Sequence, residues 1–228
     1  MALPKIDVPI FTVTLPATEK QISLRPFTVK EEKILLMANE TKSAQEILTA
    51  IKQIANNCII DDDVSIDTLP LVDLQFIFIH LRSKSVGNVA EISIRDEDDG
   101  QTYQVSIDLE SYTIDRPEVQ PSNVVMLNEA VGITLKYPTI ELANIPSIST
   151  EDLLMICLVN IFDEDQVYEV ADVSEEELRE FIGGMTTNHI EKIKTFLEGL
   201  PSIQYTINYT TEAGDEKTLT IKNINDFF

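Results

Sequence analysis

The sequence has few of the residues from which catalytic and metal sites are built. It contains two cysteines, Cys58 and Cys157, and two histidines, His80 and His189. Cysteines about a hundred residues apart do not make a zinc site, and a lone histidine in a helical stretch is more often structural than catalytic. The glycine-framed serine of hydrolases, a phosphate-binding glycine loop and a His-Glu-x-x-His string are all missing. We therefore expect a protein that is not an enzyme and that binds neither a cofactor nor a metal.

Positive charge is also scarce. The chain has 17 lysine and arginine residues against 39 aspartate and glutamate residues, which gives a formal net charge of −22. An acidic surface of this kind repels phosphate backbones, so the charge argues against a nucleic-acid partner. The simpler interpretation is that the negative charge keeps copies of the protein apart by self-repulsion. The more specific interpretation is that the charge attracts a basic partner.

Long apolar runs are missing as well. No run approaches the ~20 residues that a membrane-spanning helix needs. The N-terminal residues lack the charged segment and apolar core of a secretory signal. Both cysteines lie in apolar helical stretches, which predicts buried free thiols and is consistent with a reducing compartment. The sequence thus favours a cytoplasmic protein with no membrane partner.

The clearest pattern that is present lies between residues 69 and 109. Apolar residues nearly encircle a predicted helix over residues 73–85, which is typical of a buried helix. Gly87 supplies a left-handed position after its last turn, and Arg82 and Lys84 in that turn face the negative end of the helix dipole. Alternating apolar residues then predict a β-hairpin, so this segment is a scaffold without a reaction centre.

Two acidic segments resemble cation sites. In the hairpin turn, residues 96–100, the glycine comes one position too early for a calcium loop, and Ser106 stands where a bidentate glutamate is needed. A polar turn with Gly100 at positive φ explains the same residues. The three aspartates at 61–63 have no further ligand at a recognisable offset, so a solvated loop is the simpler interpretation.

The remaining segments predict an α+β fold in which helices pack with antiparallel hairpins. Strand-like alternation, capping boxes and glycine stops predict a hairpin over residues 11–24, helices starting after Thr28 and Ser43, strands at 124–127 and 132–137, helices over 153–162, 175–183 and 188–198, and a final hairpin turning at Gly214. The pattern changes at Pro146, so we predict two domains, residues 1–145 and 146–228, each with one helix–hairpin unit.

These two helix–hairpin units share one order of elements. Each has an apolar helix, a glycine stop, a strand, an acidic turn with glycine and a second strand. Apolar residues fall five and seven positions after the turn glycine in both units. A duplication explains this spacing, and so does a rule common to all hairpins.

The last four residues, Asn225-Asp226-Phe227-Phe228, end an acidic segment with two aromatics. Burying such side chains stabilises by ~1.5–3 kcal/mol each, so they are costly to leave in water. They fold back beneath the last hairpin, near Ile221 and Ile224, or insert into a partner. We favour folding back, because these isoleucines are close enough to share a pocket with them.

Three strings taken together resemble a known family. They are residues 24–38, which begin Leu-Arg-Pro-Phe-Thr-Val-Lys-Glu-Glu, residues 81–87, Leu-Arg-Ser-Lys-Ser-Val-Gly, and residues 132–139, Gly-Ile-Thr-Leu-Lys-Tyr-Pro-Thr. In this order they resemble the baseplate hub proteins of T-even-type contractile-tailed phages over most of the chain. Several relatives carry cysteine pairs that resemble zinc ribbons in their hairpins. The corresponding turns here hold Asp, Glu and Thr, so the resemblance implies no metal.

The resemblance implies a protein without catalysis that acts in building the baseplate hub, as an assembly factor or as a subunit. Its place would be the host cytoplasm during assembly or the virion tail baseplate. Its partners would be other phage baseplate hub or tail proteins, with no small-molecule substrate. Two other functions remain open, namely a general chaperone or adaptor for an aggregation-prone tail protein, and a small hydrolase with an unrecognised nucleophile.

Such a protein acts through its surfaces. Exposed strand edges offer docking positions, because an added strand pairs backbone to backbone. The candidate partner-binding residues are Arg25, Lys30, Arg82, Lys84, Phe227 and Phe228. For the four cations, helix capping and ordinary surface charge are the simpler explanation.

Overall fold

The structure is a computed structural model that describes residues 6–118, 121–140 and 149–221. Contacts between Cα atoms divide the chain into two compact units. Unit 1 holds the described residues of 1–66, 72–115 and 202–228, and unit 2 holds those of 67–71 and 116–201. The last hairpin therefore groups with the N-terminal part of the chain. This grouping by contacts does not tell which segments fold on their own. The predicted domain boundary at residue 145 therefore stays a prediction.

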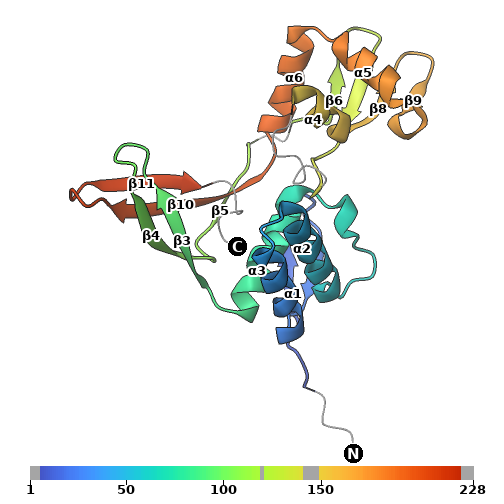
Figure 1. The fold of residues 1–228 in the computed structure, drawn as a ribbon. Coiled ribbons are helices and arrows are strands. Elements are labelled where there is room, and N and C mark those ends of the chain that lie inside the picture. The colour runs from blue at the N-terminus through green and yellow to red at the C-terminus, as the bar shows by residue number, and fades with distance from the viewer. Residues whose placement is uncertain (1–5, 119–120, 141–148, 222–228) are drawn as a thin grey trace, which may run out of the picture. The chain divides into compact units, whose positions relative to one another are not determined.

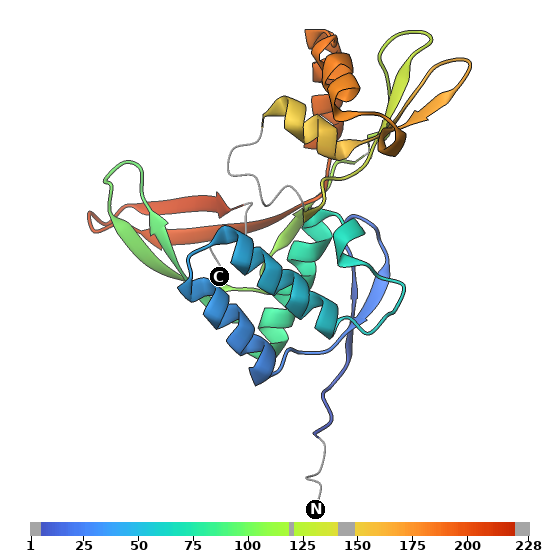
Figure 2. The same cartoon turned by 45° about the vertical axis from the view of Figure 1, so that its right-hand side comes forward.

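The predicted α+β class is confirmed, since helices and small antiparallel sheets alternate along the described chain. The first half of unit 1 contains β1 (Phe11–Thr14), β2 (Gln21–Leu24), α1 (Val29–Glu40), α2 (Ala44–Cys58), η1 (Ile66–Thr68), which continues past the boundary of the unit, and α3 (Leu71–Ser85). Figures 1 and 2 show the three helices beside the β1–β2 hairpin. The predicted capping box of Thr28 and Glu31 begins α1, and the Ser43 hydroxyl accepts from the Glu46 N–H at the start of α2.

Helix α3 is buried on nearly all sides, as predicted. Its buried apolar side chains are Leu74, Phe76, Ile77, Phe78, Ile79 and Leu81. The helix begins at Leu71, two residues before the predicted start, and ends at the predicted Ser85. It also buries a carboxylate: Asp73 accepts hydrogen bonds from the Ala17 N–H at 2.6 Å and from the Thr18 hydroxyl at 2.8 Å. Asp73 thereby ties the β1–β2 turn to the centre of unit 1.

Two long hairpins complete unit 1. They are β3 (Val89–Arg95) with β4 (Thr102–Asp108), and β10 (Ser202–Thr210) with β11 (Glu216–Ile221), whose sheet also contains β5 (Thr113–Asp115) in the order β11-β10-β5. The hairpins lie side by side in both views (Figures 1 and 2). The hairpins that share the repeated pattern are therefore neighbours in space.

The acidic turn between β3 and β4 is a polar turn, as the simpler interpretation predicted. Gly100 has φ +71°, and the Asp96 carboxylate accepts from the Asp98 N–H at 2.8 Å. The ammonium of Lys217 in β11 lies 2.7 Å from carboxylate oxygens of both Asp96 and Asp98. These contacts lower the pKa of Asp96, with the Lys217 hydrogen bond as the largest cause. A lysine of the second hairpin thus occupies the place that a cation would take.

Unit 2 is built around one antiparallel sheet. Its elements are β6 (Val124–Met126), β7 (Gly132–Leu135), α4 (Thr150–Cys157), β8 (Leu158–Phe162), β9 (Val167–Glu169), η3 (Val170–Asp172), α5 (Glu175–Gly183) and α6 (Thr187–Glu198), and its strand order is β6-β7-β8-β9. Its core gathers buried side chains from the sheet and helices, including Ile133, Leu158, Leu178, Ile193 and Phe196. The capping box of Ser174 and Glu177 begins α5 as predicted.

The predicted helix over residues 153–162 is wrong in its second half. Helix α4 ends at Cys157, and β8 follows from Leu158 to Phe162. Strand β8 pairs with β7 on one side and with β9 on the other. The β-branched Val159 and Ile161 suit such a strand. A short apolar run fits a buried helix and a buried strand equally well, so only the neighbouring strands decide between them.

Gly87 provides a test of the helix end. It has φ +142°, a conformation that essentially only glycine adopts, and its N–H donates to the Arg82 carbonyl at 3.4 Å. We expect Gly87→Val to lower the free energy of unfolding by about 1–3 kcal/mol in a urea titration. A Cβ at this position meets no atom within 4 Å, so the expected cost comes from the backbone conformation and not from a clash of the Cβ.

The matched control is Gly183→Ala. A Cβ at Gly183 also meets no atom within 4 Å, but this glycine is helical and has no positive φ. Alanine there is expected to leave the protein as stable or to stabilise it slightly. Equal unfolding curves for Gly87→Val and the natural protein would show that the helix end is misplaced.

Candidate interaction groove

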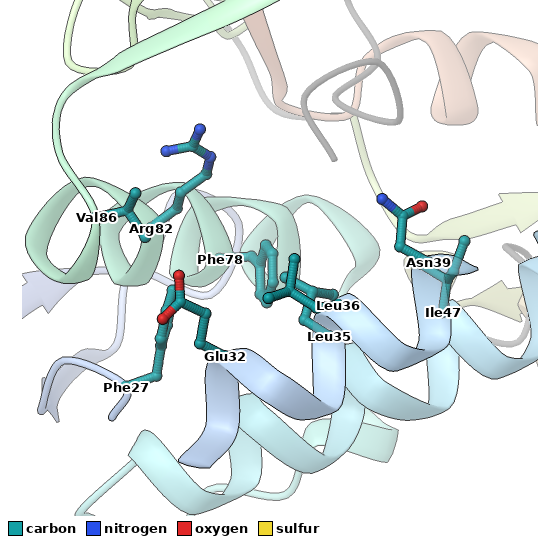
Figure 3. Close-up of a pocket in the computed structure, with 9 residues that line it drawn as sticks. All are labelled: Phe27, Glu32, Leu35, Leu36, Asn39, Ile47, Phe78, Arg82 and Val86. Atoms are coloured by element: carbon teal, nitrogen blue, oxygen red, sulfur yellow. The ribbon is translucent and has the colours of Figure 1, made fainter. Parts of the chain in front are cut away.

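An apolar groove opens between the helices of unit 1, with a volume of about 260 Å³. We call it the α1–α3 groove. It is lined by Phe27, by Glu32, Leu35, Leu36 and Asn39 of α1, by Ile47 of α2, by Phe78 and Arg82 of α3, and by Val86 directly after α3 (Figure 3). Residues far apart in the sequence therefore form one surface.

The groove exists because α1 has apolar residues on more than one face. Ala38 is buried, whereas Leu36 and Met37 are 57% and 69% exposed. Across the groove, Val86 is 58% exposed. One exposed leucine is ordinary, but apolar side chains facing one another across a hollow are typical of a contact surface.

Arg82 is the one lining residue with a buried orphan donor. Its Nη1 atom is buried and has no hydrogen-bond partner among the described residues. Glu32 also lines the groove, yet no ion pair joins the two side chains, and Figure 3 shows their charged groups standing apart. Burial lowers the pKa of the Arg82 guanidinium. A buried donor without an acceptor costs ~1–3 kcal/mol, and more when it is charged, so this group requires an explanation.

The other predicted partner-binding residues lie elsewhere. Arg25 forms an ion pair of 2.6 Å with Glu31, and Lys84 forms one of 2.8 Å with Glu110. Lys30 is exposed in the first turn of α1. Phe227 and Phe228 lie outside the described residues. The expectation that they fold back beneath the last hairpin therefore stays a prediction. Arg82 is thus the one predicted partner-binding residue that lines the groove, and the role of all six stays a prediction.

The sequence analysis missed the apolar wall of this groove. Ile34, Leu35, Leu36 and Met37 are four apolar residues in a row, and a helix that packs on one side can bury only some of them. This apolar run could have predicted that α1 has a second apolar face that is exposed. It could not show that α3 would supply the opposite wall.

The pair of Arg25 and Glu31 beside the groove has a pH-dependent consequence. Two hydrogen bonds from Arg25 hold the Glu31 pKa at about 2, against an ordinary value of 4.5. Because the pKa is lower in the folded state, the stabilisation is present above pH 4.5 and is lost as the pH falls toward 2. We expect Glu31→Gln to lower the free energy of unfolding by about 2 kcal/mol at neutral pH.

This effect is checked by urea titrations of both proteins between neutral pH and acid. The difference between them should shrink as the pH falls and disappear near the lower end of the window. Glu40→Gln, at the exposed end of the same helix, is the control and should behave like the natural protein. A pH-independent difference for Glu31→Gln would mean that the carboxylate acts through packing and not through its charge.

The histidines and cysteines have structural surroundings. His80 Nε2 lies 3.2 Å from the Tyr112 hydroxyl, and His189 Nδ1 accepts from the Thr186 N–H in the cap of α6. Cys58 and Cys157 are buried free thiols, as predicted, and burial raises the pKa of each to about 11. Their thiols therefore stay protonated near neutral pH.

Two searches of the described residues complete the survey of possible sites. The described part of the chain holds no cluster of three or more His, Cys, Asp or Glu residues placed to bind a metal ion. It also holds no helix that is long and apolar enough to span a membrane.

Unit 2 has two adjoining hollows over α5. They share Val131, Glu177 and Phe181, and their volumes are about 500 and 300 Å³. No buried orphan donor points to a ligand there among the described lining residues. The α1–α3 groove is therefore the better candidate for a specific contact.

The sequence matches the family described as T4 bacteriophage base plate protein over residues 8–228. This match covers nearly all of the chain, including the described parts of both units. No curated protein and no solved structure is significantly similar to it.

Proposed function

Because the chain belongs to the T4 bacteriophage base plate protein family, we propose that it acts in building the baseplate hub through protein–protein contacts and without catalysis. Membership makes it a structural protein of a phage tail baseplate, with other baseplate proteins as its partners. The resemblance noted in the sequence is thereby confirmed at the level of the baseplate family. The hub, as the place within the baseplate, is our proposal.

The observation that carries a role through surfaces is the α1–α3 groove. A stable specific interface buries on the order of 1,000 Å² or more and has an apolar centre with a polar rim. Leu36, Met37 and Val86 supply exposed apolar area in and beside the groove, and Arg82 supplies a directional polar group. A groove of this composition suits recognition of a protein segment better than it suits a reaction.

A strand edge supports the same role in unit 2. Strand β9 lies at the edge of its sheet and pairs only with β8 in the described structure. Val167 in this strand is 58% exposed. An open edge with an exposed apolar side chain is a position where a partner can add a strand.

The protein acts either as a subunit of the hub or as an assembly factor that leaves before the virion is complete. In the second case it is found in the host cytoplasm during assembly and not in the virion. Quantitative mass spectrometry of purified virions beside infected-cell lysate tests this choice. A fixed copy number in virions indicates a subunit, whereas presence in lysate fractions with hub proteins and absence from virions indicates an assembly factor. Absence from both virions and hub complexes contradicts the proposed function.

A general chaperone for an aggregation-prone tail protein is the second candidate, because an exposed apolar groove can bind many apolar segments. A binding competition with an unrelated unfolded protein separates the two candidates. The competitor would displace the tail partner from a general chaperone, whereas it should leave a specific hub complex unaffected.

A further inference from the structure

We propose that the α1–α3 groove binds a segment of a partner protein that presents apolar side chains next to a carboxylate, and that this carboxylate pairs with Arg82. The proposal rests on the proposed function, since it assumes a protein partner, and it adds the chemistry by which that partner is recognised. The occupant is an Asp- or Glu-containing apolar segment.

The size of the groove favours side chains over a whole small molecule. Pockets that enclose small-molecule ligands have volumes of ~300–1,000 Å³. The α1–α3 groove has about 260 Å³ and lies between exposed helix surfaces. It therefore has room for one or two apolar side chains of a segment whose backbone stays outside.

The apolar walls select what enters. Leu35, Leu36 and Ile47 on one side, and Phe78 and Val86 on the other, offer no hydrogen bonds from their side chains. An aliphatic or aromatic side chain placed between them is removed from water, which stabilises the complex by ~25 cal/mol for each Å² of apolar surface buried. Docking an anchor in such a pocket is the usual way in which a few residues supply most of the binding energy.

Arg82 selects what stands beside that side chain. The Arg82 guanidinium is half-buried, and no ion pair joins it to Glu32 across the groove. A backbone carbonyl that reaches the exposed part of the guanidinium would leave its charge unpaired. A carboxylate pairs with the charge and matches the planar geometry of the guanidinium. The charge of Arg82 therefore favours an acidic residue in the partner segment.

The surrounding charge makes this recognition distinctive. The chain carries a net charge of −22, so an acidic segment is repelled at long range and attracted locally at Arg82. Salt screens the long-range repulsion more than the partly buried pair. Affinity should therefore rise with added salt, whereas attraction between an acidic surface and a basic partner would weaken.

The test is a selection of displayed random short peptides on the full-length protein, followed by binding measurements with the selected peptides. We expect enrichment of Asp or Glu beside Leu, Ile, Val or Phe. Replacing the acidic residue of a selected peptide by its amide, or Arg82 by methionine, should weaken binding by about tenfold or more. Leu36→Asp should weaken it similarly by placing a like charge in the groove.

Lys33→Met is the matched control. Lys33 is an exposed cation of α1, but it does not line the groove. Its removal should change binding by less than about twofold. Thermal melting shows whether each variant is folded, and Arg82→Met should melt at the same or a higher temperature, because it removes a buried donor that has no acceptor.

Three results would overturn the proposal. They are selected peptides without acidic residues, equal binding by Arg82→Met and the natural protein, and a selection that enriches no peptide dependent on Leu36. Any of these leaves the proposed function untouched if the protein is found in virions or hub complexes. The proposed function fails by absence from both, whatever the peptides show.

Discussion

Replacing Asp73 with alanine is expected to lower the free energy of unfolding by about 3 kcal/mol. Asp73 is 0% exposed, and its carboxylate accepts from Ala17 N–H at 2.6 Å and from the N–H and hydroxyl of Thr18 at 3.1 and 2.8 Å. Alanine removes the acceptor and leaves the buried Ala17 N–H without a partner, whereas the donors of the exposed Thr18 can bond to water. The loss of a charge-assisted acceptor is more costly than the loss of a neutral one.

Urea titration followed by circular dichroism measures this effect. Asp62→Ala is the control, because Asp62 is an exposed aspartate in a loop of the same unit, and its replacement should change stability by less than about 0.5 kcal/mol. Asp73→Asn keeps one acceptor oxygen and should lie between alanine and the natural protein. Equal stability of Asp73→Ala and Asp62→Ala would show that the turn does not depend on the carboxylate.

The second large effect is expected from the core. Leu81 of α3 is 0% exposed. Leu81→Ala removes buried methyl groups and leaves a cavity that the surrounding helices fill only in part, so it should lower the free energy of unfolding by about 2–5 kcal/mol. The same urea titration measures it.

Leu36→Ala is the matched substitution on the surface. Leu36 is 57% exposed at the edge of the α1–α3 groove, so the same change of side chain should cost less than about 1 kcal/mol. A cost as large as that of Leu81→Ala would mean that Leu36 is covered in solution and that the groove is closed. The pair therefore tests the core and the groove together.

The two carboxylate clusters noted in the sequence have separate structural tasks. Asp61 accepts from the backbone N–H of Ser23, and Asp63 pairs with Lys20 at 2.7 Å. Asp96 and Asp98 both bind the ammonium of Lys217. In each case the partner of the carboxylate lies in another strand or turn, at a distance in sequence that no spacing rule covers.

Local signals predicted the ends of several helices well. Thr28 with Glu31 begins α1, Ser43 begins α2, and Ser174 with Glu177 begins α5. A capping box joins residues three positions apart, so both of its hydrogen-bonding partners can be recognised in the local sequence. The glycine that ends α3 was found for the same reason, since positive φ is a property of one residue.

Strands were harder to predict where they are short. Strands β5 and β9 have three residues each, and β8 was included in a helix. Each is stabilised by pairing with a strand elsewhere in the chain, as β5 is by β10 and β8 is by β7. A strand of three residues contains too little alternation to be recognised without its partner.

The resemblance of three strings already indicated the baseplate family, whereas the α+β class, the buried helix α3 and the buried free thiols could be predicted from composition and from neighbouring residues. By contrast, the contact of Asp73 with a distant turn, the pairing of Lys217 with Asp96 and Asp98, and the Arg82 donor left without an acceptor became visible only in the folded structure. Whether a charge is paired and a side chain is covered depends on which segments meet after folding, and those segments are far apart along the chain.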